Sequence, residues 1–369
     1  MRKNREEKET VIFDIPVKIV EERNAVANHA AELASFGTKA LIVTGKHSAV
    51  HCGALADVTA ALESNDTGWA LFDRVEENPS TDTVMEGRDF GLANGCDFVI
   101  GIGGGSPMDA AKAIAFMMGY PEQGVAYLDE KGPDDRTLPF LEVPTTCGTG
   151  AEITWVSVLT RTAIRKKGSI PHRLYAKMAL ADYRYLLNAP ASVIRNTSVD
   201  ALAHLAESYV NTKATEFSKM LVERGLATWK LAKGVLSGEE EMSGKMAQAL
   251  MHASVLAGMA ITHTGTSLPH GMSYPLTMEL GMPHGKACGY FLADYLKESQ
   301  SPDTIRILKL TGFDSLEEMK GFIWSACDIE KAPRELLASI AEMILASPGK
   351  LASAPFACSR EVIETIVGI

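Results

Sequence analysis

The chain has 369 residues, which exceeds the usual size of one domain and favours two. Hydrophobic residues make up 46% and charged residues 22%, the balance of a globular protein with a core of its own. The formal net charge of -10 argues against a general nucleic-acid surface, because neutralising phosphates requires a basic face. The sequence has no run of about 18 apolar residues, so we expect no membrane-spanning helix.

The six cysteines and the first residues bear on where the protein works. None of the cysteines forms a C-x-x-C pair, and in so long a chain they indicate reduced thiols of a cytosolic protein. The N-terminal sequence MRKNREEKET is charged and leads into no apolar signal core. We therefore expect a cytoplasmic location.

The first half of the chain alternates short apolar runs with longer helical patterns. In chain order these are a strand at residues 40–44 (ALIVT), a helix at 48–64, a strand at 68–72 (GWALF), a helix at 81–94, a strand at 97–101 (DFVIG) and a helix at 107–118. Strands that alternate with helices of this length predict βαβ units and a mainly parallel, Rossmann-like sheet.

The second half differs, because long amphipathic stretches replace the strand runs. We expect helices over residues 196–211, 216–236 and 239–262, separated by polar or glycine breaks. The sequence thus predicts an α/β domain over residues 1–184, followed by an all-helical domain over residues 185–369.

A glycine-rich segment, residues 101–109 (GIGGGSPMD), follows the third strand and precedes a helix. Glycines let the backbone approach an anion closely. Ser106 suits the N-cap of a helix, and Pro107 suits its first turn. Asp109 lies three residues after Ser106, as the acidic residue of a capping box does. Free N–H groups would then face a pyrophosphate. The spacing is neither that of G-x-G-x-x-G nor that of a P-loop, and a turn without a ligand remains the alternative.

A second loop, residues 144–150 (PTTCGTG), follows the apolar run at residues 140–143. Its hydroxyl residues and glycines fit a turn that lines a ligand, although an ordinary loop explains them equally when the loop is taken alone. For Cys147 we favour a small packing residue, because free thiols are readily buried.

Four side chains form a candidate metal site. Asp200 and His204 are four residues apart in the helical stretch VDALAHLAESYV, which puts both on one face. His270 and His284 bracket a segment punctuated by glycine and proline. Three imidazoles and one carboxylate make a ligand set for a divalent first-row metal. The alternatives are a hydrogen-bonded pair on a helix surface and a histidine at a helix end.

Four ordered segments resemble one family, the iron-containing (group III) alcohol dehydrogenases. They are residues 101–115, 143–154, 199–210 and 268–287, and the resemblance runs from about residue 12 to 290. It implies a dehydroquinate synthase-like architecture. It also implies an enzyme that moves a hydride between NAD(P) and a small alcohol or aldehyde.

The resemblance assigns two groups of residues. The metal ligands of the family fall on Asp200, His204, His270 and His284. The residues expected to line the cofactor are Asn78, Pro79, Gly104, Gly105, Ser106, Asp109, Thr145, Thr146, Thr149 and Lys167. Lys167 aligns with a lysine near the nicotinamide. Iron(II) is implied by the resemblance alone, since nitrogen and oxygen ligands bind zinc(II) more tightly.

The first strand carries a signal for the type of cofactor. Many relatives that use NAD place an aspartate after this strand, where it meets the ribose hydroxyls. This chain has Gly45, followed by Lys46, His47 and Ser48. Loss of a carboxylate and gain of a lysine and a hydroxyl favour a 2'-phosphate, so we expect NADP, with NAD as the alternative.

One departure from the family affects the proton transfer. Relatives carry a histidine four residues after the third ligand, whereas this chain has Tyr274. A tyrosine donates and accepts hydrogen bonds but is a poor base near neutral pH. Tyr274 and Lys167 are therefore the candidate catalytic side chains.

Several rival functions remain open at this point. A zinc glycerol dehydrogenase or a dehydroquinate synthase-like lyase has the same fold, but Leu268, Met272 and Leu276 favour a short alkyl substrate. A metal-dependent hydrolase would not explain two cofactor loops, and a non-catalytic binding protein would not need four intact ligands. Apolar helix faces and the habit of the family lead us to expect a homodimer or a larger homo-oligomer.

Overall fold

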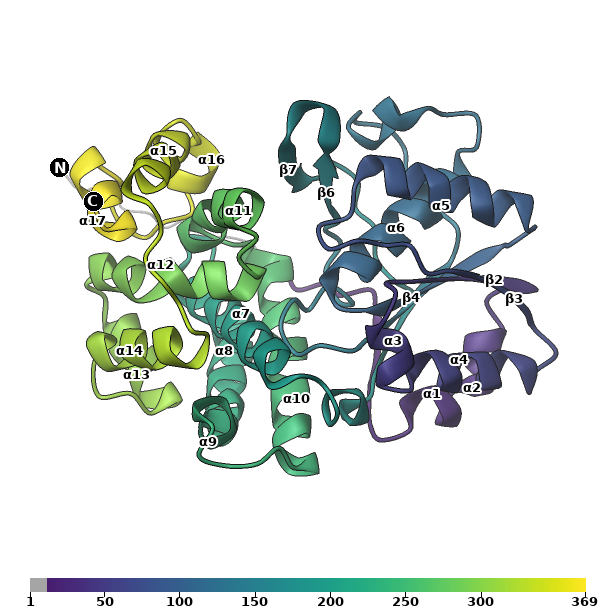
Figure 1. Ribbon diagram of the computed structural model, residues 1–369, viewed down its shortest axis with the longest axis horizontal. Helices are drawn as coiled ribbons and strands as arrows, with labels where there is room; N and C mark the ends of the chain where they lie inside the picture. Colours follow the sequence, from purple (N-terminus) through teal and green to yellow (C-terminus); the bar gives the residue numbers. More distant parts are fainter. Residues whose placement is uncertain (1–11) are drawn as a thin grey trace.

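A computed structural model describes residues 12–369, so the charged N-terminal sequence used to predict the location lies outside the described residues. The chain forms two parts that lie side by side, an α/β part with a six-stranded sheet and a helical part (Figure 1). The predicted fold class, an α/β region with a Rossmann-like parallel sheet followed by a helical region, is confirmed. Within residues 12–369, no helix combines the length and the apolar character needed to cross a membrane.

The central sheet is entirely parallel, with strand order β1-β8-β5-β4-β2-β3. Its strands are β1 (Lys18–Glu21), β2 (Lys39–Thr44), β3 (Gly68–Phe72), β4 (Phe98–Gly103), β5 (Phe140–Pro144) and β8 (Met178–Ala181). Thr44 pairs with Ile102, and Ile102 pairs with Val143. The carboxyl ends of β2, β4 and β5 therefore meet at one edge of the sheet. A separate antiparallel hairpin joins β6 (Val158–Arg161) to β7 (Lys166–Ser169).

Helices cover both faces of the sheet, which explains why its strands are continuous apolar runs (Figure 1). The α/β part contains α1 (Ala25–Asn28), α2 (Ala30–Ala34), α3 (Ser48–His51), α4 (Ala54–Glu63), α5 (Thr81–Ala93) and α6 (Gly105–Gly119). Along β2, Leu41 and Val43 pack on the side of α5 and α6, whereas Ala40 and Ile42 pack on the side of α1, α2 and α4. The helix predicted at residues 48–64 is wrong as one element, because Gly53 in the left-handed region separates α3 from α4.

The helical part is built around three long helices, α7 (Ala191–Val210), α10 (Gly244–Thr264) and α12 (His284–Ser299). The others are α8 (Glu216–Trp229), α9 (Lys233–Ser237), α11 (Leu268–Leu280), α13 (Pro302–Thr311), α14 (Leu316–Ala326), α15 (Arg334–Leu345), α16 (Pro348–Leu351) and α17 (Arg360–Val367). Short 3-10 turns are η1 (Val125–Leu128), η2 (Thr162–Ile164), η3 (Tyr183–Leu186) and η4 (Lys230–Ala232).

Two predicted helices of this part need correction. The helix expected at residues 216–236 is interrupted, because η4 separates α8 from α9. The helix expected from residue 239 begins later, at Gly244, where the Ser243 side chain accepts a hydrogen bond from the Met246 N–H. A side-chain cap satisfies a free N–H of the first turn and so fixes this start.

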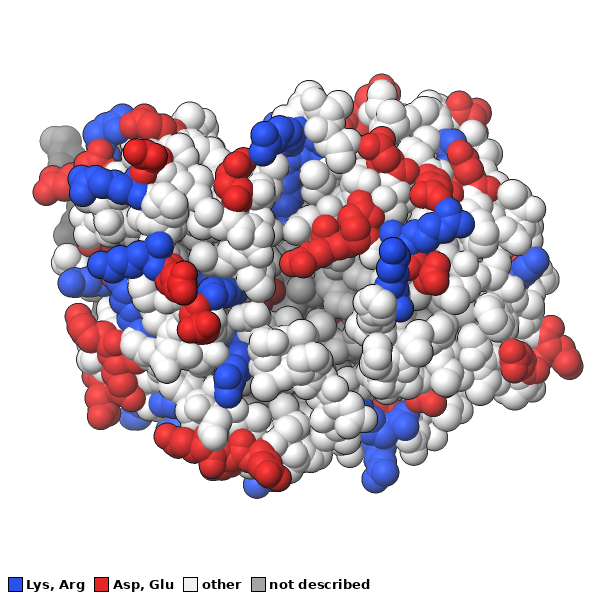
Figure 2. Space-filling view, viewed as in Figure 1, with Lys and Arg blue, Asp and Glu red and all other residues white. Residues whose placement is uncertain are grey.

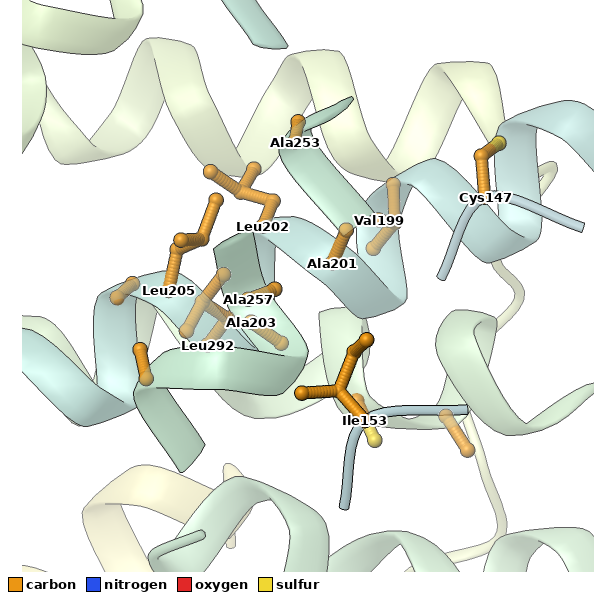
Figure 3. Close-up of a cluster of buried hydrophobic side chains, with 14 of the residues drawn as sticks. Cys147, Ile153, Val199, Ala201, Leu202, Ala203, Leu205, Ala253, Ala257 and Leu292 are labelled. Atoms are coloured by element: carbon orange, nitrogen blue, oxygen red, sulfur yellow. The ribbon is translucent and has the colours of Figure 1, made fainter. Parts of the chain in front are cut away.

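The loop after β5 joins the two parts into one core. Figure 3 shows Cys147 near Val199 of α7, and Ile153 in the same cluster of buried side chains. The Cys147 thiol is fully buried, 3.3 Å from Thr197 Oγ1, so its prediction as a packing residue is confirmed. Gly150 has a φ of 57°, and a Cβ there would lie 2.4 Å from the Cα of Gly258 in α10. The loop therefore lies directly against α10 and is held in place.

Candidate active site

A cavity between the two parts brings the predicted residues together, and Figure 2 shows the surface hollowed between the two halves. Seven of the predicted cofactor residues line it, namely Asn78, Pro79, Gly105, Ser106, Asp109, Thr149 and Lys167. So do the predicted metal ligands and the candidate catalytic tyrosine, namely Asp200, His204, His270, His284 and Tyr274. Residues more than 200 positions apart thus meet in one space.

The glycine-rich turn starts α6 earlier than predicted. Gly104 is the N-cap, in an extended conformation and without a side-chain cap, and the helix begins at Gly105. The predictions of Ser106 as N-cap and of Asp109 in a capping box are therefore wrong. Ser106 Oγ instead accepts a hydrogen bond from the Asn78 N–H at 3.1 Å, and Asp109 accepts one from the Val158 N–H at 3.1 Å. The N–H groups of this first turn keep the polarity that attracts an anion.

The two predicted cofactor loops lie against each other. The Thr145 N–H donates to the Gly103 carbonyl at 2.8 Å. A Cβ on Gly104 would lie 3.2 Å from Thr146, and a Cβ on Gly105 would lie 2.9 Å from Thr149. A side chain at either position would force the facing threonine to move, so glycine suits this close approach. Gly104, Thr145 and Thr146 thus belong to the paired loops, although they are not among the cavity-lining residues.

The segment around Asn78 ties the β6–β7 hairpin to the glycine-rich turn. Lys167 Nζ donates to Asn78 Oδ1 at 2.6 Å, and Thr160 Oγ1 donates to the Asn78 carbonyl at 3.0 Å. The Lys167 ammonium also lies 5.2 Å from the ring centre of Tyr274. Burial lowers the pKa of Lys167. Lys167 therefore lies between the cofactor loops and the metal cluster.

The residues used to predict the cofactor type follow β2. Because β2 pairs with β4, they lie at the sheet edge that carries the glycine-rich turn. Gly45 is partly buried, and Lys46 and Ser48 are exposed. None of these three residues lines the cavity. This position fits residues that contact the end of a long cofactor farthest from the cavity.

The four predicted ligands come from three helices. Asp200 and His204 lie on α7, His270 on α11 and His284 at the first turn of α12. Asp200 Oδ1 lies 3.4 Å from His270 Nε2 and 3.9 Å from His284 Nε2. Asp200 and His270 are 2% and 3% exposed, so the cluster is closed to bulk water on that side.

Two neutral imidazoles, an ionised carboxylate and the unsatisfied atoms of the cluster fit a metal cation. Burial lowers the pKa of His204 to about 4 and that of His284 to about 3, so both imidazoles are neutral near pH 7. Burial opposes ionisation of Asp200, but the neighbouring histidines lower its pKa. Asp200 Oδ1 and His270 Nε2 have no hydrogen-bond partner within residues 12–369. Burying such groups unpaired is costly, and a cation between them would satisfy both.

The tightest group of ligand atoms differs from the predicted set in one member. Asp200, His270, His284 and Cys288 each offer one atom within 4.8 Å of the others. The His204 ring instead stacks on the His270 ring, with centres 4.2 Å apart, and its Nδ1 lies 3.2 Å from the Gly148 carbonyl oxygen. The structure thus brings Cys288 into the cluster, which the sequence analysis did not foresee.

A second residue missed by the sequence analysis is Glu207, which is fully buried on α7. Its carboxylate lies 2.5 Å from His270 Nδ1 and accepts a second hydrogen bond, also 2.5 Å, from the Ser267 N–H. A carboxylate on one ring nitrogen fixes the tautomer that leaves Nε2 for a metal. Spacing places residues 200, 204 and 207 on one helix face, but it does not show that Glu207 bonds to His270.

Replacement of Glu207 by glutamine is expected to weaken metal affinity by about 10- to 100-fold, because the amide orients His270 less strongly. Titration of the apoprotein with metal in the presence of a competing chelator measures this. Glu223→Gln is the matched control, since Glu223 pairs with Arg306 on the surface of the helical part. Equal affinity in both variants would contradict the role of Glu207.

Several buried ionisable side chains lie beneath the two cofactor loops. Lys112 is fully buried and donates to the carbonyls of Ala151 and Val156 at 2.6 and 2.9 Å. Burial raises the pKa of Asp109 to about 6 and that of Glu152 to about 7. Glu152 Oε1 has no hydrogen-bond partner in the described part of the chain. The single ammonium group of Lys112 thus lies near two buried carboxyl groups, those of Asp109 and Glu152.

Glu152 is expected to make the protein less stable as the pH rises. Its carboxyl stays protonated in the folded chain up to about pH 7, whereas the unfolded carboxyl ionises near its ordinary pKa of 4.5. Folding therefore takes up a proton between these values, and the unfolding free energy falls across this window. Glu152→Gln is expected to flatten this fall and to add up to about 3 kcal/mol at pH 8.

Urea unfolding at pH 5 and pH 8 tests the role of Glu152. The exposed Glu330 offers a matched control, and Glu330→Gln should keep the wild-type dependence on pH. An unchanged dependence in Glu152→Gln would show that the buried carboxyl does not take up the proton.

Comparisons with known proteins agree with this geometry. The family model described as "Iron-containing alcohol dehydrogenase" matches residues 16–183, and the model of the family's C-terminal part matches residues 194–341. Lactaldehyde reductase of Escherichia coli K12 is 34% identical over 296 residues, 76% of this chain and 75% of the relative. Sulfoacetaldehyde reductase of Bilophila wadsworthia is 31% identical over 334 residues, 87% of this chain and 84% of the relative.

Solved structures give the same result over a larger share of the chain. An iron-containing alcohol dehydrogenase of Thermotoga maritima superposes with a TM-score of 0.87 at 30% identity, covering 97% of this chain and 99% of that one. The chain belongs to the iron-containing alcohol dehydrogenase family. It is an oxidoreductase of the alcohol dehydrogenase and aldehyde reductase class, as the sequence analysis predicted.

Proposed function

We propose that the cavity holds a nicotinamide cofactor on its α/β side and a divalent metal on its helical side, with a small alcohol or aldehyde between them. The observation that carries this proposal is the joint lining of one cavity by Ser106 and Thr149 and by Asp200 and His270. In this proposal, residues 1–184 bind the dinucleotide and residues 185–369 hold the metal.

The metal would be held by Asp200, His204, His270 and His284; the bond between His204 Nδ1 and the Gly148 carbonyl leaves Nε2 of that ring free for it. When bound, it would supply a Lewis acid that stabilises the alkoxide or polarises the carbonyl of the substrate. The protein contributes the neutral imidazoles of His204 and His284, the ionised carboxylate of Asp200 and the exclusion of water on the buried side. The remaining cavity wall includes Val156, Val158 and Ile261, which fits a short substrate with an apolar chain.

Tyr274 and Lys167 are the proposed polar groups beside the reacting atoms. Burial raises the pKa of Tyr274 to about 12, so its phenol stays protonated and donates a hydrogen bond. This chemistry suits holding a substrate or water oxygen better than removing a proton. Lys167 lies over the Tyr274 ring and bonds to Asn78, so it would position the nicotinamide end of the cofactor.

For the cofactor, the proposal is a preference for NADP(H). A solved sulfoacetaldehyde reductase of Bifidobacterium kashiwanohense, 24% identical with a TM-score of 0.84, is described in complex with NAD+. In this chain Gly45 offers no carboxylate to repel a 2'-phosphate, and Lys46 and Ser48 offer a cation and a hydroxyl. One charge-assisted hydrogen bond gained on phosphate is enough for a preference of about tenfold.

The cofactor preference is tested by kcat/KM for NADPH and NADH with a panel of short aldehydes, anaerobically and with iron(II) restored. We expect NADPH to lead by about tenfold or more and Gly45→Asp to reverse the order, because a carboxylate repels the 2'-phosphate. Ala60→Asp, which adds the same charge on the exposed side of α4, should change neither value. An NADH advantage of about tenfold in the wild type would overturn the preference.

Three further parts of the proposal concern the working form of the protein. We propose iron(II) as the resident metal by family membership, with zinc(II) as the competitor. We also propose a homodimer or larger homo-oligomer in the cytoplasm. Sedimentation of the purified holoenzyme distinguishes a monomer from these assemblies.

A further inference from the structure

Lys350 lies on the short helix α16, and its ammonium lies beside the wall of the cavity. Its Nζ donates a hydrogen bond to Thr266 Oγ1 at 3.0 Å, and Thr266 lines the cavity. The stem of the lysine lies along the first turn of α11, because a Cβ on Gly271 would lie 3.3 Å from Lys350 Cδ. Gly271 directly follows His270 of the metal cluster. Lys350 therefore places a cation on the helical side of the cavity, close to this cluster.

A chain of hydrogen bonds holds α16 in this position. The Tyr295 hydroxyl of α12 donates to Ser267 Oγ at 3.0 Å, and Ser267 Oγ lies 2.9 Å from Ser353 Oγ. The Ser353 hydroxyl in turn donates to the Lys350 carbonyl at 2.6 Å. Both serines are buried, and Ser267 is the N-cap of α11. The backbone of Lys350 is thus fixed relative to the helix that carries His270.

The ammonium of Lys350 has donors to spare. An ammonium carries three N–H donors, and the bond to Thr266 uses one of them. Burial lowers the pKa of Lys350, whereas Glu207 and Cys288 of the metal cluster raise it. The Glu207 carboxylate, however, is already held by His270. An anion that enters the cavity at Thr266 would therefore gain a charge-assisted hydrogen bond from Lys350.

The wall around Thr266 suits an apolar chain that ends in an acid. The end of α10 contributes Ile261 and Gly265 to this wall, and neither carries a charge. Because the Thr266 hydroxyl accepts from Lys350, its own hydrogen can point to a bound anion. The acidic side chains of the cavity lining belong to other places, namely Glu77 and Asp109 of the α/β part and Asp200 of the metal cluster.

We propose that Lys350 selects substrates by charge, so that the preferred alcohols and aldehydes carry a carboxylate or a sulfonate at the end of a short chain. The inference rests on the proposed function, because it places the reacting oxygen at the metal and the acid at Thr266 and Lys350. Lys350 acts only in binding and takes no part in the hydride transfer. The apolar part of the wall contacts the carbon chain between the two ends of the substrate.

A purely structural role for Lys350 predicts a different result. The C-terminal carbonyls of a helix attract a cation, and Lys350 lies near the C-terminal end of α10. Loss of such a role would lower activity toward charged and uncharged substrates alike. A pair of substrates that differ only in charge therefore distinguishes substrate binding from support of α10.

The first test compares two aldehydes that carry an acid, glyoxylate and succinate semialdehyde, with their methyl esters. The metal-loaded protein is assayed with its better cofactor, and kcat and KM are measured separately. In wild type, the acid of at least one pair should exceed its ester in kcat/KM by about tenfold or more, as one charge-assisted hydrogen bond provides. In Lys350→Met, the KM of this acid should rise by about tenfold, with kcat and the ester unchanged.

Two further variants complete this comparison. Lys350→Arg keeps the charge and should keep most of the preference for the acid. Lys309→Met is the matched control, because Lys309 is an exposed lysine of α13, and it should behave as the wild type.

A second test measures binding without turnover. The full chain is titrated calorimetrically with propanesulfonate, with and without metal, so that binding to the metal itself is recognised. We expect Lys350→Met to weaken the binding by about tenfold in both forms and Lys309→Met to leave it unchanged.

The outcomes separate this inference from the proposed function. Equal turnover of acid and ester by the wild type, or an undiminished preference in Lys350→Met, overturns the role of Lys350 and leaves the proposed function standing. A loss of acid and ester turnover alike in Lys350→Met identifies the structural role and also overturns the inference. If the wild type reduces no aldehyde of this set or of the earlier panel, the proposed function fails, and the propanesulfonate titration still decides whether Lys350 binds an anion.

Discussion

Replacement of His270 by alanine is expected to lower kcat/KM for aldehyde reduction by about 1,000-fold or more. Polarisation of a carbonyl by a metal contributes several kcal/mol, and each 1.4 kcal/mol corresponds to about tenfold in rate. His270 links Asp200 to Glu207, so its loss removes one ligand and also leaves two buried carboxylates without their partner. Metal content and turnover should therefore fall together.

The measurement is steady-state kinetics on anaerobically metal-loaded protein, with bound metal determined on the same sample. His263→Ala is the matched control, because His263 is a partly buried histidine of α10 that stacks on Phe13 outside the cluster. It should keep both metal and activity. Full turnover by His270→Ala at wild-type metal content would overturn the metal site proposed here.

The sequence predicted those strands that are apolar along their whole length. β2 and β4 were found because strands covered by helices on both faces are continuous hydrophobic runs bounded by turns. β3 was found from its apolar residues, although it is an edge strand in which Gly68 and Trp69 are exposed. β1 and β8 were missed. Each has four residues, and β8 (MALA) is rich in residues that favour helix as much as strand. Their pairing is decided by the neighbouring strands and not by local preference.

The start of α6 shows why capping signals can mislead. Ser106 and Asp109 have the right spacing for a capping box, but Gly103 and Gly104 let the chain turn earlier, so that Ser106 already lies inside the helix. Both side chains are then free to bond to distant segments, at Asn78 and Val158. The sequence around Ser106 and Asp109 cannot predict partners that lie so far away along the chain.

The candidate metal site was predicted in part by spacing and in part by resemblance. The i, i+4 spacing of Asp200 and His204 places them on one face of α7, but nothing local brings His270 and His284 from two other helices to the same point. Glu207 and Cys288 lie three and four residues after predicted ligands. A carboxylate or a thiol at such a position is common in ordinary helices, so only the structure distinguishes them.

Replacement of Gly285 by alanine is expected to disturb the close packing of α12 against α7. Gly285 follows His284, and a Cβ at this position would lie 1.9 Å from the Asn196 carbonyl oxygen and 2.8 Å from the Asp200 Cβ. Because the nearest atom belongs to the backbone, Gly285→Ala must push the two helices apart. We expect the unfolding free energy of the apoprotein to fall by about 3 kcal/mol, at the upper end for overpacking.

Gly285→Ala is also expected to abolish tight metal binding, because the same displacement moves His284 away from Asp200 and opens the 3.9 Å separation on which the site depends. Urea unfolding of the apoprotein and a metal titration measure the two effects separately. Gly321→Ala is the control, since Gly321 lies in α14 with no described atom within 4 Å of its Cβ position and should gain about 0.5–1 kcal/mol. Should Gly285→Ala match the wild type in both measurements, the contact between α7 and α12 would not be what sets the geometry of the ligands.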